Sequence, residues 1–189
     1  MNKTDKILVT GASGFIGSRL IKSLYEGGFT DIRATSWSRD LRNDFEGCEN
    51  VEFLKGNLQD ADFCEIVSKD IDVIFHCAAN TSNALDTKFN PLLHVTPNIE
   101  MNVNLMEQSW RNKVRKFMFI SSNTTYPDMG DIPCTEDIEV QTPDIVPVYK
   151  AVGNMKRYCE TLCDFFSNQI HEPMQCIIIR PSNAFGPND

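Results

Sequence analysis

Short apolar runs alternate along the whole chain with stretches whose apolar residues recur at helical spacing. The runs predict buried strands, because short continuous apolar segments are typical of strands that are covered on both faces. Helical crossovers between successive strands indicate a parallel sheet. The predicted strands are Lys6–Thr10, Ile32–Ser36, Val51–Lys55, Val73–Cys77, Lys116–Ser121 and Gln175–Arg180, and the predicted helices begin at Phe15 and cover Asp62–Ser68, Ile99–Trp110 and Ala151–Phe166.

Strands joined in this way predict the α/β class: a doubly wound parallel sheet of the Rossmann type, in three α/β/α layers, with strand order 3-2-1-4-5-6. The 189 residues are 41% hydrophobic, which is enough for one sizeable core, so we expect a single domain over residues 1–189. A long, acidic, proline-rich loop from Pro127 to Pro147 should lie at the carboxyl ends of the strands, where ligands bind. We expect it to form a lid or a substrate wall, or else a solvated loop.

The segment from Thr10 to Gly17 carries the strongest chemical signal, because it follows the first predicted strand directly and opens the first helix. Its glycines, Gly11, Gly14 and Gly17, are spaced three apart. Such glycines let the backbone turn sharply, approach phosphates without hindrance from Cβ, and present helix N-terminal N–H groups to negative charge. The segment therefore predicts a pyrophosphate site for a dinucleotide; the alternative is a tight strand-to-helix turn without a ligand.

The end of the second predicted strand indicates which dinucleotide is bound. An acidic residue usually holds the ribose 2′-hydroxyl of NAD there, whereas this chain reads Trp37-Ser38-Arg39. Ser38 and Arg39 suit a 2′-phosphate, and Trp37 or the plane of Arg39 suits stacking on adenine. We therefore predict NADP in preference to NAD. The acidic residue Asp40, next in the sequence, leaves NAD as the alternative cofactor. The alternative interpretation of Arg39 is a solvated side chain.

Composition excludes several classes of partner. The formal net charge of −8 leaves no basic field for a nucleic acid, and no apolar stretch reaches the eighteen or so residues that a membrane span needs, so we expect a cytoplasmic protein. Seven cysteines, several within apolar runs, suit reduced thiols. Cys159 and Cys163 lie four apart on a predicted helix; without a second pair at ligand spacing they indicate buried side chains rather than a metal site.

Five segments in sequence order resemble one known family. Thr10–Gly17 is similar to a TGxxGFxG loop, residues 56–58 to a GDL turn, and residues 76–79 to an HxAA segment. Residues 119–126 resemble an ISSxxVYG strand end, and residues 180–187 an RPxNxxGP segment. Together they resemble the extended short-chain dehydrogenase/reductases, in particular the NAD-dependent epimerase/dehydratase family, which works on nucleotide sugars.

The resemblance implies a set of binding residues. Asn57 stands where the family has aspartate, and its amide oxygen can still accept a hydrogen bond. Asn183, in the RPxNxxGP-like segment, is implied as a substrate residue. The cofactor residues implied by the segments and by the second strand are Gly11, Ser13, Gly14, Phe15, Ile16, Gly17, Trp37, Ser38, Arg39, Asn57, Leu58, Cys77, Ala78, Ala79, Lys156 and Pro181.

The chemistry of the family needs a tyrosine as acid/base, a lysine that lowers its pKa and binds the nicotinamide ribose, and a hydroxyl that polarises the reacting group. Ser122 falls at the hydroxyl position, unless it only caps the next turn. The usual YxxxK spacing is broken, since Val152 precedes Lys156 by four residues and Gly153 follows Tyr149 by four.

Two hypotheses follow for the acid/base pair. Pro147 makes a helix start near Tyr149 plausible, so Tyr149 and Lys156 form a re-spaced pair with Tyr149 in the entering turn. Alternatively, Tyr149 packs under the loop, Lys156 is a solvated helix residue, and the chain binds its cofactor without normal turnover.

The resemblance implies an NAD(P)-dependent epimerase or carbonyl reductase that acts on a nucleotide sugar by hydride transfer, or the cofactor-binding portion of one. Dehydratase chemistry is disfavoured, because Asn123-Thr124 follows Ser122 where that branch has an acidic pair. The alternative is a non-catalytic NAD(P)-binding sensor. We expect the family's C-terminal substrate lobe to be absent from this chain. A homodimer through the helices Ile99–Trp110 and Ala151–Phe166 is also expected.

Overall fold

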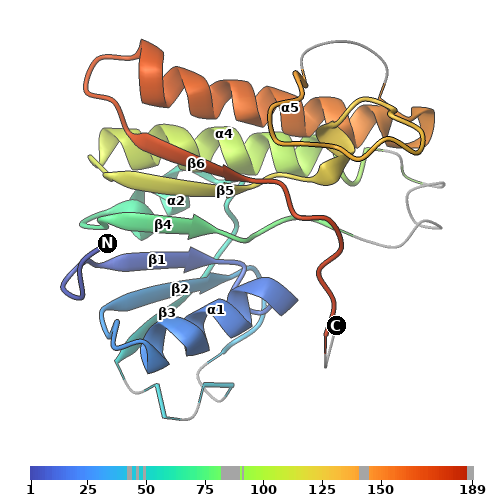
Figure 1. Ribbon diagram of the computed structural model, residues 1–189. Coiled ribbons are helices and arrows are strands. Elements are labelled where there is room, and N and C mark those ends of the chain that lie inside the picture. Colours follow the sequence, from blue (N-terminus) through green and yellow to red (C-terminus); the bar gives the residue numbers. More distant parts are fainter. Residues whose placement is uncertain are drawn as a thin grey trace.

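The computed structural model describes residues 1–41, 44–45, 47–48, 50–81, 90, 92–140 and 145–186. In this part of the chain, six parallel strands form one sheet in the order β3-β2-β1-β4-β5-β6 (Figure 1). This order confirms the predicted doubly wound Rossmann fold. The strands are β1 (Ile7–Thr10), β2 (Ile32–Ser36), β3 (Val51–Lys55), β4 (Val73–His76), β5 (Lys116–Ile120) and β6 (Gln175–Ile179).

Helices cover both faces of the sheet. The helix α1 (Phe15–Glu26) lies on one face, and α2 (Ala61–Ser68), α4 (Thr96–Arg111) and α5 (Lys150–Asp164) lie on the other (Figure 1). Short helical turns flank the longer elements: η1 (Asn123–Thr125) follows β5, η2 (Pro147–Tyr149) precedes α5, and the π-helical η3 (Phe165–Gln169) continues α5.

Two apolar cores follow from the alternation of side chains along β1. Ile7 and Val9 pack with Ile21 of α1, whereas Leu8 between them packs with Leu105 of α4 on the opposite face. All five side chains are fully buried. Because successive strand residues point to opposite faces, a strand covered on both sides is mostly apolar, as β1 is over Ile7–Val9. Burial of each such side chain contributes about 1.5–3 kcal/mol.

The element boundaries differ from the predicted ones by a few residues. The predicted helix Ile99–Trp110 begins earlier, at Thr96, because Pro97 lies in the first turn, where its missing N–H costs no hydrogen bond. The predicted helix Ala151–Phe166 begins at Lys150, and its α-helical part ends at Asp164, where the π-helical turn takes over. Each strand bound differs from its prediction by at most one residue.

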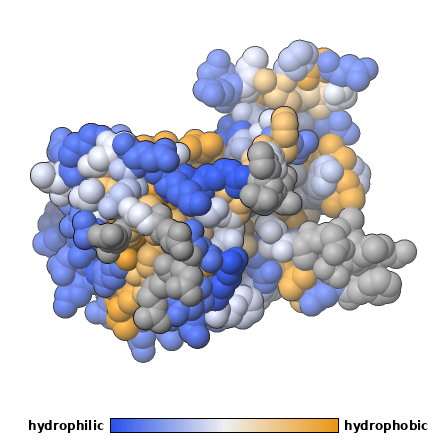
Figure 2. Space-filling view, turned by 90° about the horizontal axis from the view of Figure 1, so that it is seen from below, coloured by the Kyte–Doolittle hydropathy of each residue, from blue (hydrophilic) through white to orange (hydrophobic). Residues whose placement is uncertain are grey.

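The surface is largely hydrophilic on the face seen from below, and apolar side chains gather there in separate patches (Figure 2). At the sheet edge, Ile177, Ile178 and Ile179 of β6 are all exposed. No helix within the described ranges is long and apolar enough to cross a membrane.

Candidate functional site

The loop between β1 and α1 requires glycine at defined positions. Gly11 has a φ of +66°, and a Cβ atom there would lie 2.7 Å from the backbone of Ala78 after β4. At Gly17, a Cβ atom would collide with the carbonyl oxygen of Gly11. The glycines therefore allow the loop to pack against the end of β4, as the spacing predicts.

The N-terminus of α1 has the features of an anion site. Its capping residue is Gly14, which offers no side-chain hydrogen bond to the first turn, and no acidic residue lies in that turn. The first N–H groups of a helix lack intrahelical partners and carry partial positive charge. They are therefore available to a phosphate at this end of the helix.

A first hollow of about 300 Å³ runs from this loop toward the end of β2. Trp37 and Ser38 line it, together with Asn57 and Leu58 from the turn after β3. Arg39 does not line it, and its guanidinium forms an ion pair of 2.8 Å with Asp44. The structure thus brings four of the residues expected near the adenosine to one hollow.

A second hollow of about 410 Å³ continues from the first toward α5. Both are lined by Gly14 and by the segment 77–81, so that the two form one groove over the carboxyl ends of the strands. Phe15, Ile16 and Gly17 line the second hollow as well. At its far end it reaches Ser122 and Lys156.

Ser122 both caps a turn and faces the groove. Its Oγ accepts hydrogen bonds from the backbone N–H of Thr124 at 3.1 Å and from the Thr124 hydroxyl at 3.0 Å. These bonds fix the η1 turn after β5. The two interpretations of Ser122 are therefore compatible, since the same oxygen orders the turn and lines the second hollow.

Lys156 is held against the end of β5. Its Nζ donates to the carbonyl oxygen of Ile120 at 2.7 Å and lies 4.8 Å from the centre of the Phe119 ring. Burial lowers the pKa of Lys156, and the charge of Glu160 opposes this change. Lys156 is thus not a solvated helix residue.

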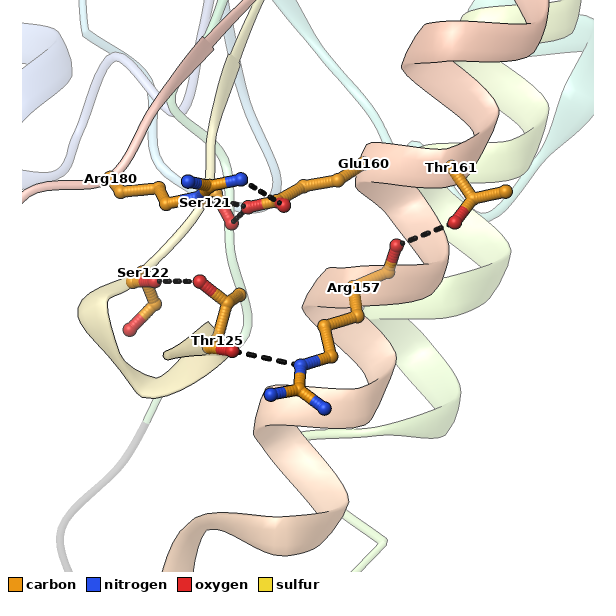
Figure 3. Close-up of polar contacts among 7 residues, drawn as sticks. All are labelled: Ser121, Ser122, Thr125, Arg157, Glu160, Thr161 and Arg180. Atoms are coloured by element: carbon orange, nitrogen blue, oxygen red, sulfur yellow. Dashed lines mark hydrogen bonds and ion pairs between the residues drawn. The ribbon is translucent and has the colours of Figure 1, made fainter. Parts of the chain in front are cut away.

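A polar network joins α5 to the ends of β5 and β6 (Figure 3). Arg180 donates two hydrogen bonds to the Glu160 carboxylate, at 2.9 and 2.8 Å, and Ser121 donates to the same carboxylate. Arg157 donates to the carbonyl oxygen of Thr125 at 2.8 Å. Because Glu160 lies one turn after Lys156, the network also sets the position of Lys156 relative to Ser122.

Gly153 allows α5 to approach the Ser122 turn. A Cβ atom at this position would collide with the carbonyl oxygen of Thr124 and would lie 2.8 Å from Ile145. Gly153, which interrupts the YxxxK spacing in the sequence, thus has a packing reason at this position.

Tyr149 is not brought together with Lys156. It ends η2 and caps α5, so it lies in the entering turn, where the sequence placed it. However, it lines a third hollow, of about 550 Å³, together with Tyr126 and the loop after β5. Val152, one turn before Lys156, lines the second hollow instead.

The residues of the RPxNxxGP-like segment are only partly in the groove. The carbonyl oxygen of Pro181 accepts a hydrogen bond from the Asn123 N–H at 3.2 Å, which ties the segment to η1. Asn183 is exposed and is not among the residues that line these hollows, whereas Ala184 lines the second. Pro187 lies outside the described residues.

Sequence reasoning missed a buried polar pair beneath the groove. The Thr10 hydroxyl and His76 Nδ1 are 2.7 Å apart, and Thr10 Oγ1 accepts a hydrogen bond from the Ala78 N–H at 3.1 Å. Burial lowers the pKa of His76 to about 3, and the charge of Lys156 adds to this effect. The signal in the sequence is a polar residue at the end of each of two buried strands, which an apolar core alone does not require.

Asn98 of α4 holds the segment after β4 from the other side. Its Oδ1 accepts from the Asn80 N–H at 2.8 Å, and its Nδ2 donates to the Asn80 carbonyl oxygen at 2.9 Å. Thr10 and Asn98 therefore fix the backbone at Ala78 and Asn80, both of which line the groove.

The fold and the groove define the class of NAD-binding Rossmann domains. The family model described as the NAD dependent epimerase/dehydratase family matches residues 7–189. The chain belongs to this family.

Similar proteins include enzymes that act on nucleotide sugars. UDP-glucose 4-epimerase of Dictyostelium discoideum is 28% identical over 196 residues, covering 96% of this chain and 53% of that protein. The structure of UDP-N-acetylglucosamine 4-epimerase from Methanobrevibacter ruminantium has a TM-score of 0.77 at 26% identity and covers 97% of this chain and 56% of that one. A short-chain dehydrogenase/reductase superfamily protein from Agrobacterium tumefaciens with bound NAD has a TM-score of 0.69 at 26% identity, covering 92% and 48%. This chain thus spans about half the length of these relatives.

Proposed function

We propose that this chain is the cofactor-binding portion of an NAD(P)-dependent enzyme that epimerises or reduces a nucleotide sugar by hydride transfer. The main observation in support is the groove that runs from Trp37 past the glycine loop to Ser122 and Lys156. Its two ends match the two halves of a dinucleotide, and its middle is the N-terminus of α1. The named activities of the epimerase relatives support the nucleotide-sugar substrate.

The residues present fit a dinucleotide. The backbone contacts at Gly11 and Gly17 leave no room for side chains, which suits a close approach to a pyrophosphate. Trp37 and Asn57 would contact the adenosine, and Lys156 would contact the nicotinamide ribose. A nicotinamide in this groove supplies or accepts a hydride.

Ser122 and Lys156 would act on the sugar. The Ser122 hydroxyl would donate a hydrogen bond to the reacting oxygen, and the positive charge of Lys156 would favour loss of a proton from a neighbouring hydroxyl. In the re-spaced pair, Tyr149 would exchange that proton after its turn moves toward the groove. About half of the Tyr149 surface is exposed, so this movement need not break a packed core.

A second candidate function is dinucleotide binding without turnover. It is favoured by Val152, which lines the second hollow one turn before Lys156 and cannot carry a proton. The Val152→Tyr variant separates the two functions, because it restores the YxxxK spacing of the family. If the chain is non-catalytic, Val152→Tyr should gain NAD(P)-dependent turnover. If the chain uses Tyr149, the unmodified chain should turn over and Tyr149→Phe should lose that turnover.

Preference for NADP over NAD remains our proposal. Ser38 lines the first hollow, and Arg39 stands beside it with 62% of its side chain exposed. Arg39 would have to leave Asp44 to reach a 2′-phosphate. The ion pair is exposed, and such pairs contribute only about 0.2–1 kcal/mol, so a phosphate can compete for the guanidinium.

Pairing of two chains through α4 and α5 is likewise proposed. Tyr158 of α5 and Phe165 at the start of η3 are about half exposed, which leaves apolar surface for a partner helix. Trp110 instead packs near Phe166 and donates its Nε1–H to the Glu172 carbonyl oxygen at 3.0 Å. The test is sedimentation of the chain and of Tyr158→Glu, which would remain monomeric.

The first experiment is calorimetric titration of the 189-residue chain with NADP⁺ and NAD⁺ in parallel. Binding of NADP⁺ that weakens in Arg39→Ala supports the proposed cofactor. UDP-glucose is then added to the loaded chain, and reduction of the nicotinamide is followed by absorbance. Failure to bind either dinucleotide would refute the proposal, whereas binding without reaction would favour the second candidate function.

A further inference from the structure

Two thiols face each other at the far end of α5 from the groove. Cys163 lies in the last turn of α5, and Cys176 lies near the start of β6. The two thiols are close enough to influence each other's ionisation, and the Cys176 Sγ donates a hydrogen bond to the Met174 carbonyl oxygen at 3.6 Å. Cys163 is buried, Cys176 is partly exposed, and both are free thiols.

The local backbone holds Cys176 in this position. The chain leaves α5 through the π-helical turn η3, and Ser167 in that turn accepts a hydrogen bond from the Cys176 N–H at 2.8 Å. The Ser167 hydroxyl in turn donates to the Met174 carbonyl oxygen at 3.2 Å. These bonds fix β6 against the end of α5.

A hollow of about 420 Å³ opens over the pair. Both thiols line it, together with the polar side chains of Ser167 and Asn168 and one acidic residue, Asp164. Ligand sites in proteins start at about 300 Å³, so a small molecule can enter this hollow and reach the partly exposed Cys176, with the buried Cys163 behind it. The chain carries a formal net charge of −8, which disfavours an anionic reagent here.

The two thiols are not equal. The neighbouring Cys163 thiol lowers the pKa of Cys176, whereas the interaction with Cys176 and burial both raise the pKa of Cys163. In contrast, burial raises the pKa of Cys64 to about 12 and that of Cys159 to about 11. Because the thiolate is the nucleophile, Cys176 is the more reactive of the pair.

We propose that Cys163 and Cys176 form a thiol–disulfide exchange site, which reacts with small neutral disulfides and closes a disulfide between α5 and β6. The Cys176 thiolate attacks one sulfur of the reagent, forms a mixed disulfide and releases one thiolate. Cys163 then loses its proton and attacks Cys176, and the second half of the reagent leaves as a thiolate. Both leaving groups take up protons, so two protein thiols are oxidised and one disulfide is reduced to two thiols.

The site is separate from the groove. Lys156 precedes Cys163 by seven residues, about 10 Å along the helix axis. Cys176 pairs with Phe117 near the start of β5, whereas Ser121 and Ser122 lie after the end of that strand. Oxidation is therefore expected to leave access to the groove unchanged, and the inference does not depend on the proposed function.

The test uses bis(2-hydroxyethyl) disulfide on the folded chain, with all products located by peptide mass mapping after acid quenching. Cys134 is exposed and is first replaced in Cys134→Ser, so that it does not react. We expect this chain to lose two hydrogens and to yield one cross-linked peptide pair that joins Cys163 to Cys176. With Cys163→Ser added, Cys176 should retain one hydroxyethylthio group; with Cys176→Ser added instead, Cys163 should remain unmodified.

A matched pair of variants tests the influence of residue 163 on the reactivity of Cys176. Cys163→Ser keeps a hydrogen-bond donor beside Cys176, whereas Cys163→Ala removes it, so Cys176 should react more slowly in Cys163→Ala. Modification of Cys176 no faster than that of Cys64 or Cys159 would overturn the proposal, as would a mixed disulfide that persists while Cys163 is present. The Cys134→Ser chain retains both thiols and decides the matter even if the Cys163 variants do not fold.

Discussion

The buried imidazole of His76 makes the stability of this fold depend on pH. It lies beneath the glycine loop, with its Nδ1 2.7 Å from the Thr10 hydroxyl, and it is 2% exposed. Burial is the main cause that lowers its pKa from 6.5 to about 3, and the positive charge of Lys156 is the next. The folded chain therefore binds a proton at His76 less readily than the unfolded chain does.

The difference in proton binding at His76 sets the sign and the size of the change in stability with pH. Above the unfolded pKa of 6.5, both states hold a neutral imidazole, so the full stability is present. As the pH falls below 6.5, the unfolded state takes up a proton and the folded state does not, until the pH approaches 3. Between about pH 7.5 and about pH 5, linkage gives a loss of about 2 kcal/mol from His76 alone.

The assay is urea unfolding of the chain and of His76→Gln at both pH values. Glutamine keeps an acceptor for Thr10 but does not titrate, and all other groups are common to the two chains. We expect the wild-type chain to lose about 2 kcal/mol more than the variant between the two pH values. Equal losses in both chains would show that His76 is not held neutral by the fold and would refute the reasoning.

Three further perturbations test the site. Glu160→Leu should destabilise the chain by about 3 kcal/mol in urea unfolding, because Arg180 would lose its partner in a largely buried ion pair. As a control, Glu107→Ala removes an exposed ion pair and should change stability by less than about 1 kcal/mol. Similar losses in the two variants would contradict the role of burial. Asp44→Ala should strengthen NADP⁺ binding but not NAD⁺ binding in calorimetry, since Arg39 loses its competing partner, and equal changes for both would exclude Arg39 from 2′-phosphate recognition. Gly11→Ala should abolish binding of both dinucleotides. Gly11 has a left-handed backbone conformation, and a Cβ atom there would lie 2.7 Å from the backbone of Ala78. Unchanged affinity would show that the loop does not hold the pyrophosphate.

The fold could be predicted because its signals are local. Continuous apolar runs such as Ile7–Val9 are typical of strands covered on both faces, and parallel strands need crossover connections that are usually helical. The expectation of a phosphate-binding loop was accessible for the same reason, since the turn at Gly11 needs a residue without Cβ. Family resemblance then indicated Ser122 and Lys156, which the structure places in one groove.

Whether the side chains of Tyr149 and Lys156 lie together could not be predicted from their spacing in the sequence. Seven residues place two side chains on similar faces of a regular helix, but Tyr149 ends the 3-10 turn before α5 and lines the third hollow, whereas Lys156 lines the second. The pairing of Arg39 with Asp44 was missed for a related reason, because an exposed arginine has no sequence pattern that selects its partner.

By itself, the sequence determined the strand order, the glycine loop and the family, since each depends on periodicity or on a residue type that the backbone demands. Only the tertiary structure decided which side chains share the groove. It placed Val152 rather than Tyr149 beside Lys156, buried His76 beneath the loop and brought Cys163 to Cys176. The physical reason is that such contacts arise where separate elements pack together, and neither spacing nor local propensity specifies the distance between them.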